Sequence, residues 1–401
     1  MLELEEARER ILGVIPTLPA ESIPVGTAVG RIIAEEVHAP IDLPGFDNSA
    51  MDGYAVRADD LKGASADAPV TLQLRGEIPA GVVMAGSVER GTCARIYTGS
   101  ALPQGADAVV MQEDTRPVPG HPTEIAFLDG IKPWENVRLR GEDVKREARL
   151  FSAGEVVRVG GAGLMAALGL KAIRVNRQPV IGLLSTGSEL LEAGQPLAPG
   201  KIYESNRVTL ATLLMQAGAV PKVFPLVPDT LGATQAALEA ALDQCDATIT
   251  TGGVSVGEHD HVKKAFEQIG GVMEFWKVAV KPGKPFVFGR RKEKFLFGLP
   301  GNPVSALVTF LLLVRPALLR WQGATDVNLP ISQGRLAEAI VNRAERRHFV
   351  RVRLDATGEV HSTGVQASHI LSSLAQANGL VDVPPQTTLV SGATVSVLRW
   401  E

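Results

Sequence analysis

The chain has 401 residues, of which 45% are hydrophobic and 21% are charged, the profile of a globular protein of about two to four domains. Its 40 lysines and arginines are balanced by 44 acidic residues, so no basic excess favours bulk binding to nucleic acid. Two cysteines, Cys93 and Cys245, are too few for a disulfide framework or a cysteine-based zinc site, and they suit a reducing compartment.

The N-terminal part is predicted to combine short helices with a β-rich insert. Residues 2–14 carry apolar side chains at helical spacing, and their acidic, amphipathic character indicates no secretory signal. A second short helix is expected to follow Thr27 and to run through Arg31 to Val37. Residues 54–130 alternate short apolar runs with turns, which predicts a small β-rich domain, and residues 131–177 add a charged loop and a Gly-rich apolar helix.

From Pro179 onward, strands and helices alternate, which predicts a parallel α/β sheet. Phe295–Val314 is a window of 20 uncharged residues, but GLPGNP interrupts it. We therefore interpret it as a buried strand, a loop and a buried helix, and not as a membrane span. Residues 331–401 hold alternating strands such as FVRVRLD and TVSVLRW, which predict a small C-terminal barrel or sandwich.

Four loops follow expected strands of the sheet, at the carboxyl ends where open α/β sheets bind ligands. Glycines and hydroxyls in such loops let backbone N–H groups cradle a phosphate. Each loop alone is equally well explained as a tight turn with a helix cap, but four at one edge favour a site. The loops are residues 185–190, 228–230, 250–260 and 299–306, and their candidate binding residues are Ser185, Thr186, Gly252, Gly253, Ser255, Pro300 and Asn302.

The basic segment FWKVAVKPGKPFVFGRRKEK is predicted to contribute an anion site. Lys277 and Lys281 are four residues apart and would face the same side of a strand, and Lys284 lies on a stiff Pro-Gly turn. Apolar neighbours flank these three lysines, and a compact ammonium suits an oxyanion. Residues 290–294 are expected to be a solvated surface.

Acidic residues occur beside the same loops. Glu189, Asp229, Glu258 and Asp260 could each cap a helix, or hold Mg²⁺ together with a bound polyphosphate. His259 and His261 flank Asp260, but one His-x-His pair is weak support for a transition metal, and we expect ordinary polar roles for both.

The remaining candidates lie outside the α/β region. The aperiodic loop GFDNSAMDGYAV contains Asp52, which is either turn chemistry or a positioned carboxylate, and Thr98 lies at a strand end in RIYTGSALPQ. In the tail, alternation places Arg351 and Arg353 on one face, and Ser368 precedes His369 without thereby forming a catalytic dyad. Walker A, HExxH and GxGxxG motifs are absent from the sequence. The residues thus predict a multidomain protein whose α/β domain binds a phosphorylated or oxyanionic ligand with Mg²⁺.

The order of the longer motifs resembles that of the molybdopterin molybdenumtransferase family, which in turn resembles the E domain of gephyrin. The resemblance covers nearly the whole chain. It is carried by GFDNSAMDGYAV, IYTGSALPQGADAVVMQED, RLRGEDV, STGSEL, IYESNR, TTGGVSVGEHD, WKVAVKPGKP, GLPGNPVSA and QASHILSSL.

The resemblance implies insertion of molybdate into adenylylated molybdopterin, with Mg²⁺-dependent release of AMP. It implies a homodimer with a cleft lined by both subunits, and transient contacts with other molybdenum cofactor biosynthesis proteins. The charge balance and the lack of a signal or spanning segment separately predict a cytoplasmic protein with no nucleic-acid or membrane partner. It also implies a four-part subunit. The expected parts are a split linear domain at 1–43 and 131–177, a β-rich insert at 44–130, a molybdopterin-binding α/β domain at 178–325 and a C-terminal β-barrel at 326–401.

Carried over residue by residue, the resemblance assigns roles to ten side chains. Lys277 and Lys281 would hold molybdate or the terminal phosphates, and three carboxylates would orient pterin, phosphates or Mg²⁺. Asp52, Thr98 and Asp143 would reach into the cleft. The complete set is Asp52, Thr98, Asp143, Glu189, Asp229, Asp260, Lys277, Lys281, Arg351 and Ser368.

Two other functions stay open at this point. A molybdopterin adenylyltransferase resembles the isolated α/β domain, but it typically carries a TGGTG-type loop, whereas this chain has TGGVSVG and the GFDNSAMDGYAV insert. A non-catalytic scaffold, like gephyrin in its clustering role, would not require the lysines and carboxylates to converge.

Overall fold

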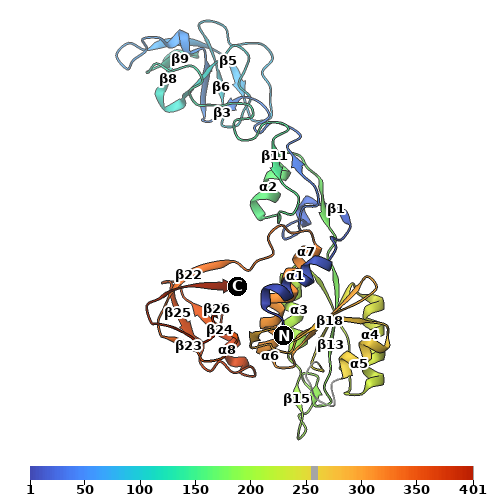
Figure 1. The fold of residues 1–401 in the computed structure, drawn as a ribbon. Helices are drawn as coiled ribbons and strands as arrows, with labels where there is room; N and C mark the ends of the chain where they lie inside the picture. The colour runs from blue at the N-terminus through green and yellow to red at the C-terminus, as the bar shows by residue number, and fades with distance from the viewer. Residues whose placement is uncertain (254–260, 401) are drawn as a thin grey trace.

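The computed structural model describes residues 1–253 and 261–400. A β-rich lobe is separated from a wider part, here called the wide end, which contains the α/β sheet and the C-terminal strands (Figure 1). A narrow connection made of two chain segments joins them. The connection pairs distant parts of the chain. Strand β1 (Ala20–Pro24) runs antiparallel to β12 (Ala172–Asn176), and β2 (Val37–His38) runs antiparallel to β11 (Arg149–Phe151). Helix α2 (Val159–Ala167) packs beside them over a small core.

The expected second helix at 31–37 is wrong. A short 3₁₀ turn, η1 (Val25–Thr27), precedes extended backbone, in which Ile32 and Ile33 form bridges with Val156 and Val175. Branched side chains favour this paired conformation over a helix. The predicted first helix is present as α1 (Leu4–Val14), but its buried face packs against the helices of the wide end.

The β-rich lobe is a six-stranded sheet in the order β7-β4-β6-β5-β9-β8. Apolar side chains on both of its faces build separate small cores. A two-stranded ladder of β3 (Asn48–Ser49) and β10 (Val137–Arg138) lies at its base. The sheet strands are β4 (Gly53–Val56), β5 (Val70–Ile78), β6 (Thr92–Ile96), β7 (Ala108–Met111), β8 (Thr115–Val118) and β9 (His121–Phe127), with the short helices η2 (Ala58–Leu61) and η3 (Gln112–Asp114).

The wide end contains the predicted α/β sheet, in the order β16-β13-β17-β21-β20-β18. The first four strands are parallel, but β20 and β18 continue the sheet antiparallel, so the sheet is mixed and not wholly parallel as expected. The strands are β13 (Val180–Ser185), β16 (Val220–Val223), β17 (Ala247–Thr251), β18 (Val272–Trp276), β20 (Val287–Arg291) and β21 (Lys294–Leu299).

Helices cover both faces of this sheet because its buried strands carry apolar side chains on alternate sides. Leu183 and Phe297 point into a large core with α1, whereas Leu184 and Leu296 point into a second core with α4 and α5. The helices are α3 (Asn206–Gln216), α4 (Leu231–Gln244), α5 (His261–Gln268), α6 (Pro303–Thr309) and α7 (Arg315–Trp321), with a π-helical turn, η4 (Phe310–Val314), joining the last two.

The continuous helix Pro303–Trp321 is the one helix of the described residues that is long and apolar enough to cross a membrane. Its most apolar window has a mean hydropathy of 1.6, and 83% of that window is buried inside the structure. It is therefore placed as a core helix, following β21 and a loop as the sequence predicted.

The C-terminal strands form a closed barrel of five, because β24 pairs with both β25 and β26 in the ring β24-β25-β22-β28-β26. The strand β19 (Val280–Lys281) of the preceding unit joins it by pairing with β24. The elements are β22 (Ile331–Leu336), β24 (Arg347–Leu354), β25 (Glu359–Ser362), β26 (Gly379–Val383) and β28 (Thr394–Arg399), with a β23 (Ile340–Asn342) and β27 (Thr387–Leu389) pair and helix α8 (Leu371–Ala375).

Candidate functional site

A pocket of about 570 Å³ lies at the carboxyl ends of β13, β17 and β21, the edge where the sequence predicted a site. Six of the predicted residues line it, and they come from three separate loops. These are Thr186 and Glu189, Gly252 and Gly253, and Pro300 and Asn302. The other lining residues, which sequence reasoning did not select, are Leu190, Ile202, Tyr203, Glu204, Ser205, Asn206, Thr251, Pro285, Gly301, Pro303, His369 and Leu371.

The loop after β17 can adopt its position because two of its residues are glycines, which have no side chain. Gly252 and Gly253 adopt φ values of +81° and +64°, a left-handed conformation that other residues rarely adopt. A Cβ on Gly252 would lie 2.6 Å from the Thr186 carbonyl oxygen, and one on Gly253 would lie 2.7 Å from Val262. Only glycine therefore lets this loop approach the loop after β13 so closely.

The loop after β13 is fixed from both sides. Ser185 is fully buried, and its hydroxyl bonds the Glu204 carboxylate at 3.0 Å and the Thr251 hydroxyl at 2.8 Å. Ser185 thus lies beneath the pocket, whereas Thr186 lines it. The Asp229 carboxylate accepts from the Ser188 backbone N–H at 2.9 Å, which ties the 228–230 loop to the same place.

A buried ion pair under the pocket was missed by sequence reasoning. Glu204 accepts from the Arg207 Nε at 3.1 Å, and their side chains are 3% and 8% exposed. Arg207 also donates to Glu192 at 2.7 Å and to the Phe224 carbonyl at 2.7 Å. Burial opposes the charge, but the bonds to both glutamates raise the pKa of Arg207. The motif IYESNR contains both partners, yet a Glu and an Arg three apart look like an ordinary surface pair.

The predicted lysines do not share one face of a strand. Strand β18 ends at Trp276, and Lys277 then adopts φ +76°, with its Nζ 4.0 Å from the Trp276 ring centroid. Lys281 lies in β19 opposite His348, and Lys284 is exposed on the turn whose Pro285 lines the pocket. None of the three lysines is among the lining residues.

The C-terminal barrel reaches the pocket through one segment. Asn302 Nδ2 donates to the Ser368 hydroxyl at 3.0 Å, and His369 lines the pocket. Arg351 is fully buried beneath this segment and fixes it by donating to the Val365 carbonyl at 2.9 Å and the Ala367 carbonyl at 3.2 Å. Arg353, expected on the same face, is exposed.

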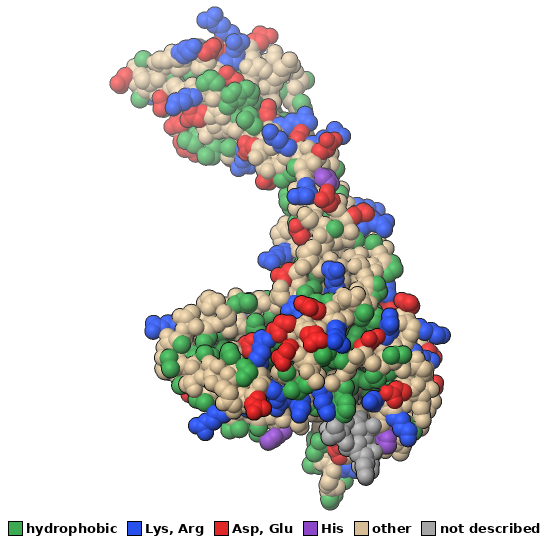
Figure 2. All heavy atoms as spheres, viewed as in Figure 1, with side chains coloured by type: hydrophobic (Ala, Val, Ile, Leu, Met, Phe, Trp, Pro, Cys, Tyr) green, Lys and Arg blue, Asp and Glu red, His purple; other side chains and the backbone are tan. Residues whose placement is uncertain are grey.

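The contact of β19 with β24 brings basic side chains close to one another. Arg351 NH1 has no hydrogen-bond partner within the described ranges, and burial lowers the pKa of this guanidinium. Burial also lowers the pKa of His348 to about 4, and the charges of Lys281 and Arg351 add to that shift. Basic and acidic side chains are interspersed on the visible face where the barrel meets the α/β unit (Figure 2).

Asp52 and Thr98 contact each other, but neither residue lines the pocket. The Asp52 carboxylate accepts from the Thr98 N–H and hydroxyl, both at 2.8 Å, and these bonds hold the pKa of Asp52 below its usual range. Both residues are exposed in the β-rich lobe, at the end of the molecule opposite the α/β sheet (Figure 1). Asp143 lies between β10 and β11, also away from the sheet, with its N–H bonded to the Leu43 carbonyl at 3.1 Å.

Two predicted residues, Ser255 and Asp260, lie outside the described residues, as do Glu258 and His259. His261 begins α5. Among the described residues, three potential metal-ligating side chains gather within 4.8 Å of one another at one place, Asp355, Glu359 and His361. That place is the β24–β25 turn, so Glu189 and Asp229 are not part of a preassembled group of three within the described residues.

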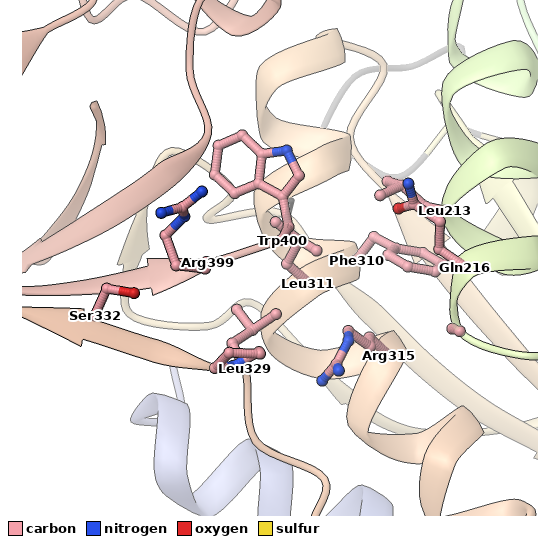
Figure 3. A pocket seen from close by; sticks show the side chains of 11 residues that line it. Leu213, Gln216, Phe310, Leu311, Arg315, Leu329, Ser332, Arg399 and Trp400 are labelled. Atoms are coloured by element: carbon pink, nitrogen blue, oxygen red, sulfur yellow. The ribbon is translucent and has the colours of Figure 1, made fainter. Parts of the chain in front are cut away.

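A second cavity, of about 370 Å³, lies between α3, the Pro303–Trp321 helix and the barrel strands (Figure 3). It contains none of the predicted site residues. Arg315 on its wall donates to the Val327 and Asn328 carbonyls at 3.2 and 3.1 Å, so this cation fixes the linker to the barrel. The sheet-edge pocket is therefore the candidate site.

Comparisons with known proteins match the whole chain. Three family models fit consecutive stretches, the MoeA N-terminal region (domain I and II) at residues 2–169, a probable molybdopterin binding domain at 182–320, and the MoeA C-terminal region (domain IV) at 333–400. The chain is 39% identical to the molybdopterin molybdenumtransferase of Haemophilus influenzae, over 99% of this chain and 98% of that protein.

Two further relatives agree. Molybdopterin molybdenumtransferase 2 of Mycobacterium tuberculosis is 40% identical over 93% of each chain. The crystal structure of the molybdopterin biosynthesis moeA protein from Pyrococcus horikoshii superposes with a TM-score of 0.86 at 30% identity, covering 100% of both chains.

Proposed function

Because this chain belongs to the molybdopterin molybdenumtransferase family, we propose that its sheet-edge pocket is where molybdenum is inserted into molybdopterin. The activity itself, molybdenum insertion during molybdenum cofactor biosynthesis, follows from the family. The finer proposal names adenylylated molybdopterin and molybdate as substrates and AMP as the by-product.

One observation carries the proposal, namely the convergence of three loops on one pocket lined by backbone and small polar side chains. Gly252 and Gly253 expose their backbone, and Thr186 and Asn302 add side-chain donors. Such groups suit a phosphorylated, polar ligand. A volume of about 570 Å³ accommodates a pterin-sized molecule but is lower than expected for a whole nucleotide-pterin, so part of the substrate extends outside it.

Molybdate is assigned to the cationic contact of β19 and β24. Lys281 lies opposite His348 of β24, and Arg351, farther along β24, has an NH1 donor without a partner among the described residues. Ser368 is held beside Asn302 at the pocket, so this anion site adjoins the proposed pterin site. A buried cation without an acidic partner favours binding of an anion.

The described residues fit Mg²⁺ only if the substrate completes its shell. Glu189 lines the pocket and Asp229 is held beside the same loop, which offers two carboxylates. Mg²⁺ is commonly held by one or two carboxylates together with substrate phosphates. When bound, the ion would neutralise charge on the phosphoanhydride, while Glu189 and Asp229 hold it and the glycine loop orients the phosphates.

A second copy of the chain is proposed to complete the site. Asp52 and Thr98 form an exposed pair that the chain does not bring to its own pocket. An apolar groove of about 680 Å³ lies beside α3 and the edge strand β16, where Val208, Met215 and Val223 are 71%, 59% and 52% exposed. An exposed apolar edge of this kind is usually covered by a partner, and we propose that a homodimer covers it.

We also propose a cytoplasmic location and transient contacts with other proteins of molybdenum cofactor biosynthesis. The experiment for the function is a turnover assay with purified adenylylated molybdopterin, molybdate and Mg²⁺, following AMP release. AMP release that depends on molybdate supports the proposal. Adenylylation of the free pterin by ATP, without molybdate-dependent AMP release, would instead point to an adenylyltransferase.

A further inference from the structure

Arg207 bonds three partners that lie in the segment 189–204 and in the loop after β16. It bonds the Glu204 carboxylate below the pocket, the Phe224 carbonyl after β16, and Glu192 in the loop between β14 (Leu190–Leu191) and β15 (Ile202–Tyr203). Its side chain is 8% exposed, and all three guanidinium nitrogens are hydrogen-bonded. A guanidinium has a planar array of donors, so it fixes the directions of these partners as well as their distances.

The segment 189–204, here called the arm, projects from the wide end beyond the rest of the α/β unit (Figure 1). It supplies one wall of the pocket, through Glu189, Leu190, Ile202, Tyr203 and Glu204. Its outer part packs little, since Leu197 and Ile202 are 60% and 56% exposed. A segment with few buried contacts opens at low free-energy cost. The position of the arm therefore depends on its polar contacts.

The attachments at the outer and inner ends of the arm differ. Within the arm, the Tyr203 hydroxyl donates to the Gln195 carbonyl at 2.7 Å, and at its base Lys201 donates to the carbonyl of the preceding Ser188 at 2.5 Å. The Glu192 carboxylate, by contrast, connects the arm to Arg207 in the body at 2.7 Å. Arg207 in turn connects through Glu204 to Ser185 and hence to the Thr251 hydroxyl.

We propose that Arg207 is a positioning residue that holds the arm against the pocket through Glu192, and thereby sets the fit of the pterin substrate. The identity of that substrate rests on the proposed function. Arg207 does not line the pocket and so acts only through Glu204 and Glu192. Glu192 is 51% exposed in the single chain, where it also lines the groove that we propose a second copy covers. Arg207 keeps Glu204 as a charged partner when the Glu192 contact is removed.

The test is Glu192→Gln, with Glu21→Gln as the matched control. Glu21 is 45% exposed and pairs with a mostly buried Arg31, at 2.5 Å, in the β1 connection away from the pocket. We expect Glu192→Gln to raise KM for adenylylated molybdopterin about fivefold, with kcat and Tm close to wild type. Amide hydrogen exchange in residues 190–203 should speed up in Glu192→Gln and stay unchanged in Glu21→Gln.

A conservative variant separates positioning from general stability. Glu192→Asp keeps the negative charge, so its KM should lie between the values of wild type and Glu192→Gln. If Glu192 served only general stability, the KM of Glu192→Asp would not return toward the wild-type value. Unchanged KM and unchanged exchange in Glu192→Gln, measured in an enzyme whose wild type releases AMP with molybdate, would overturn the inference about Arg207 alone. A wild type without that activity would overturn the proposed function, while the exchange measurement would still test the attachment of the arm.

Discussion

The close approach of two loops at Gly252 gives a prediction with a calculable size. Gly252→Ala places a methyl group 2.6 Å from the Thr186 carbonyl oxygen at a φ of +81°. That oxygen cannot retreat easily, because the Thr186 N–H donates to the Thr251 carbonyl at 3.0 Å and Thr186 also bridges Val227. The left-handed conformation costs about 1–2 kcal/mol, and the forced contact adds about 1–3 kcal/mol.

Gly270→Ala is the control that isolates the contact. Gly270 has φ +83°, and nothing lies within 4 Å of its added Cβ. It belongs to the same α/β unit, so it should show the conformational cost alone, a loss of roughly 2–6 °C in Tm, against roughly 5–15 °C for Gly252→Ala. KM for adenylylated molybdopterin should rise only in Gly252→Ala. Equal thermal shifts in the two variants, with normal KM in both, would refute the described loop packing.

Three further predictions concern separate contacts. Lys281→Ala should raise the half-saturating molybdate concentration about tenfold while leaving Tm nearly unchanged; full activity at limiting molybdate would exclude Lys281 from the anion site. Asn302→Ala removes the bond to Ser368 at 3.0 Å and should raise KM several-fold, which steady-state AMP release would measure, and an unchanged KM would refute this role. Burial opposes ionisation of Asp246, but hydrogen bonds from Arg177 and the Val180 N–H outweigh it and lower the pKa of Asp246. Its stabilising contribution is therefore present above the unfolded pKa of about 4 and lost as pH falls through the lower folded value. Tm should thus decline below about pH 4 less steeply in Asp246→Asn than in wild type, and identical slopes would contradict this.

The pocket was predictable because its signals are local. A buried strand followed by Gly, Ser and Thr residues marks a strand end, and parallel order brings such ends to one edge. The sequence therefore located Thr186, Gly252 and Asn302 in the pocket that the structure contains. The family and its molybdenum-inserting activity are confirmed by relatives that match nearly the full chain.

Other features depend on contacts that no short segment reveals. The helix expected at 31–37 is replaced by extended backbone because Ile32 and Ile33 pair with distant residues. Lys277 and Lys281 do not share a strand face as predicted, because Lys277 adopts a left-handed conformation between two short strands. Tertiary pairing overrides local propensity in both cases.

The site residues and domain boundaries taken from the resemblance remain predictions. Arg351 illustrates why their roles need the fold. On sequence it was a candidate substrate-binding residue, whereas the structure buries it between β24 and the segment before Ser368, where it bonds the Val365 and Ala367 carbonyls. Its remaining donor keeps an anion-binding role open to test.

The central claim is that the pocket of one chain works with Asp52 of a second. It is tested most directly by mixing two inactive variants, Asp52→Asn and Glu189→Gln, after unfolding and refolding them together. If the site is shared, each mixed dimer has one intact site, and a random mixture should recover about a quarter of wild-type AMP release. If the mixture contains heterodimers yet stays as inactive as either variant alone, the two residues do not act across subunits and the account is contradicted.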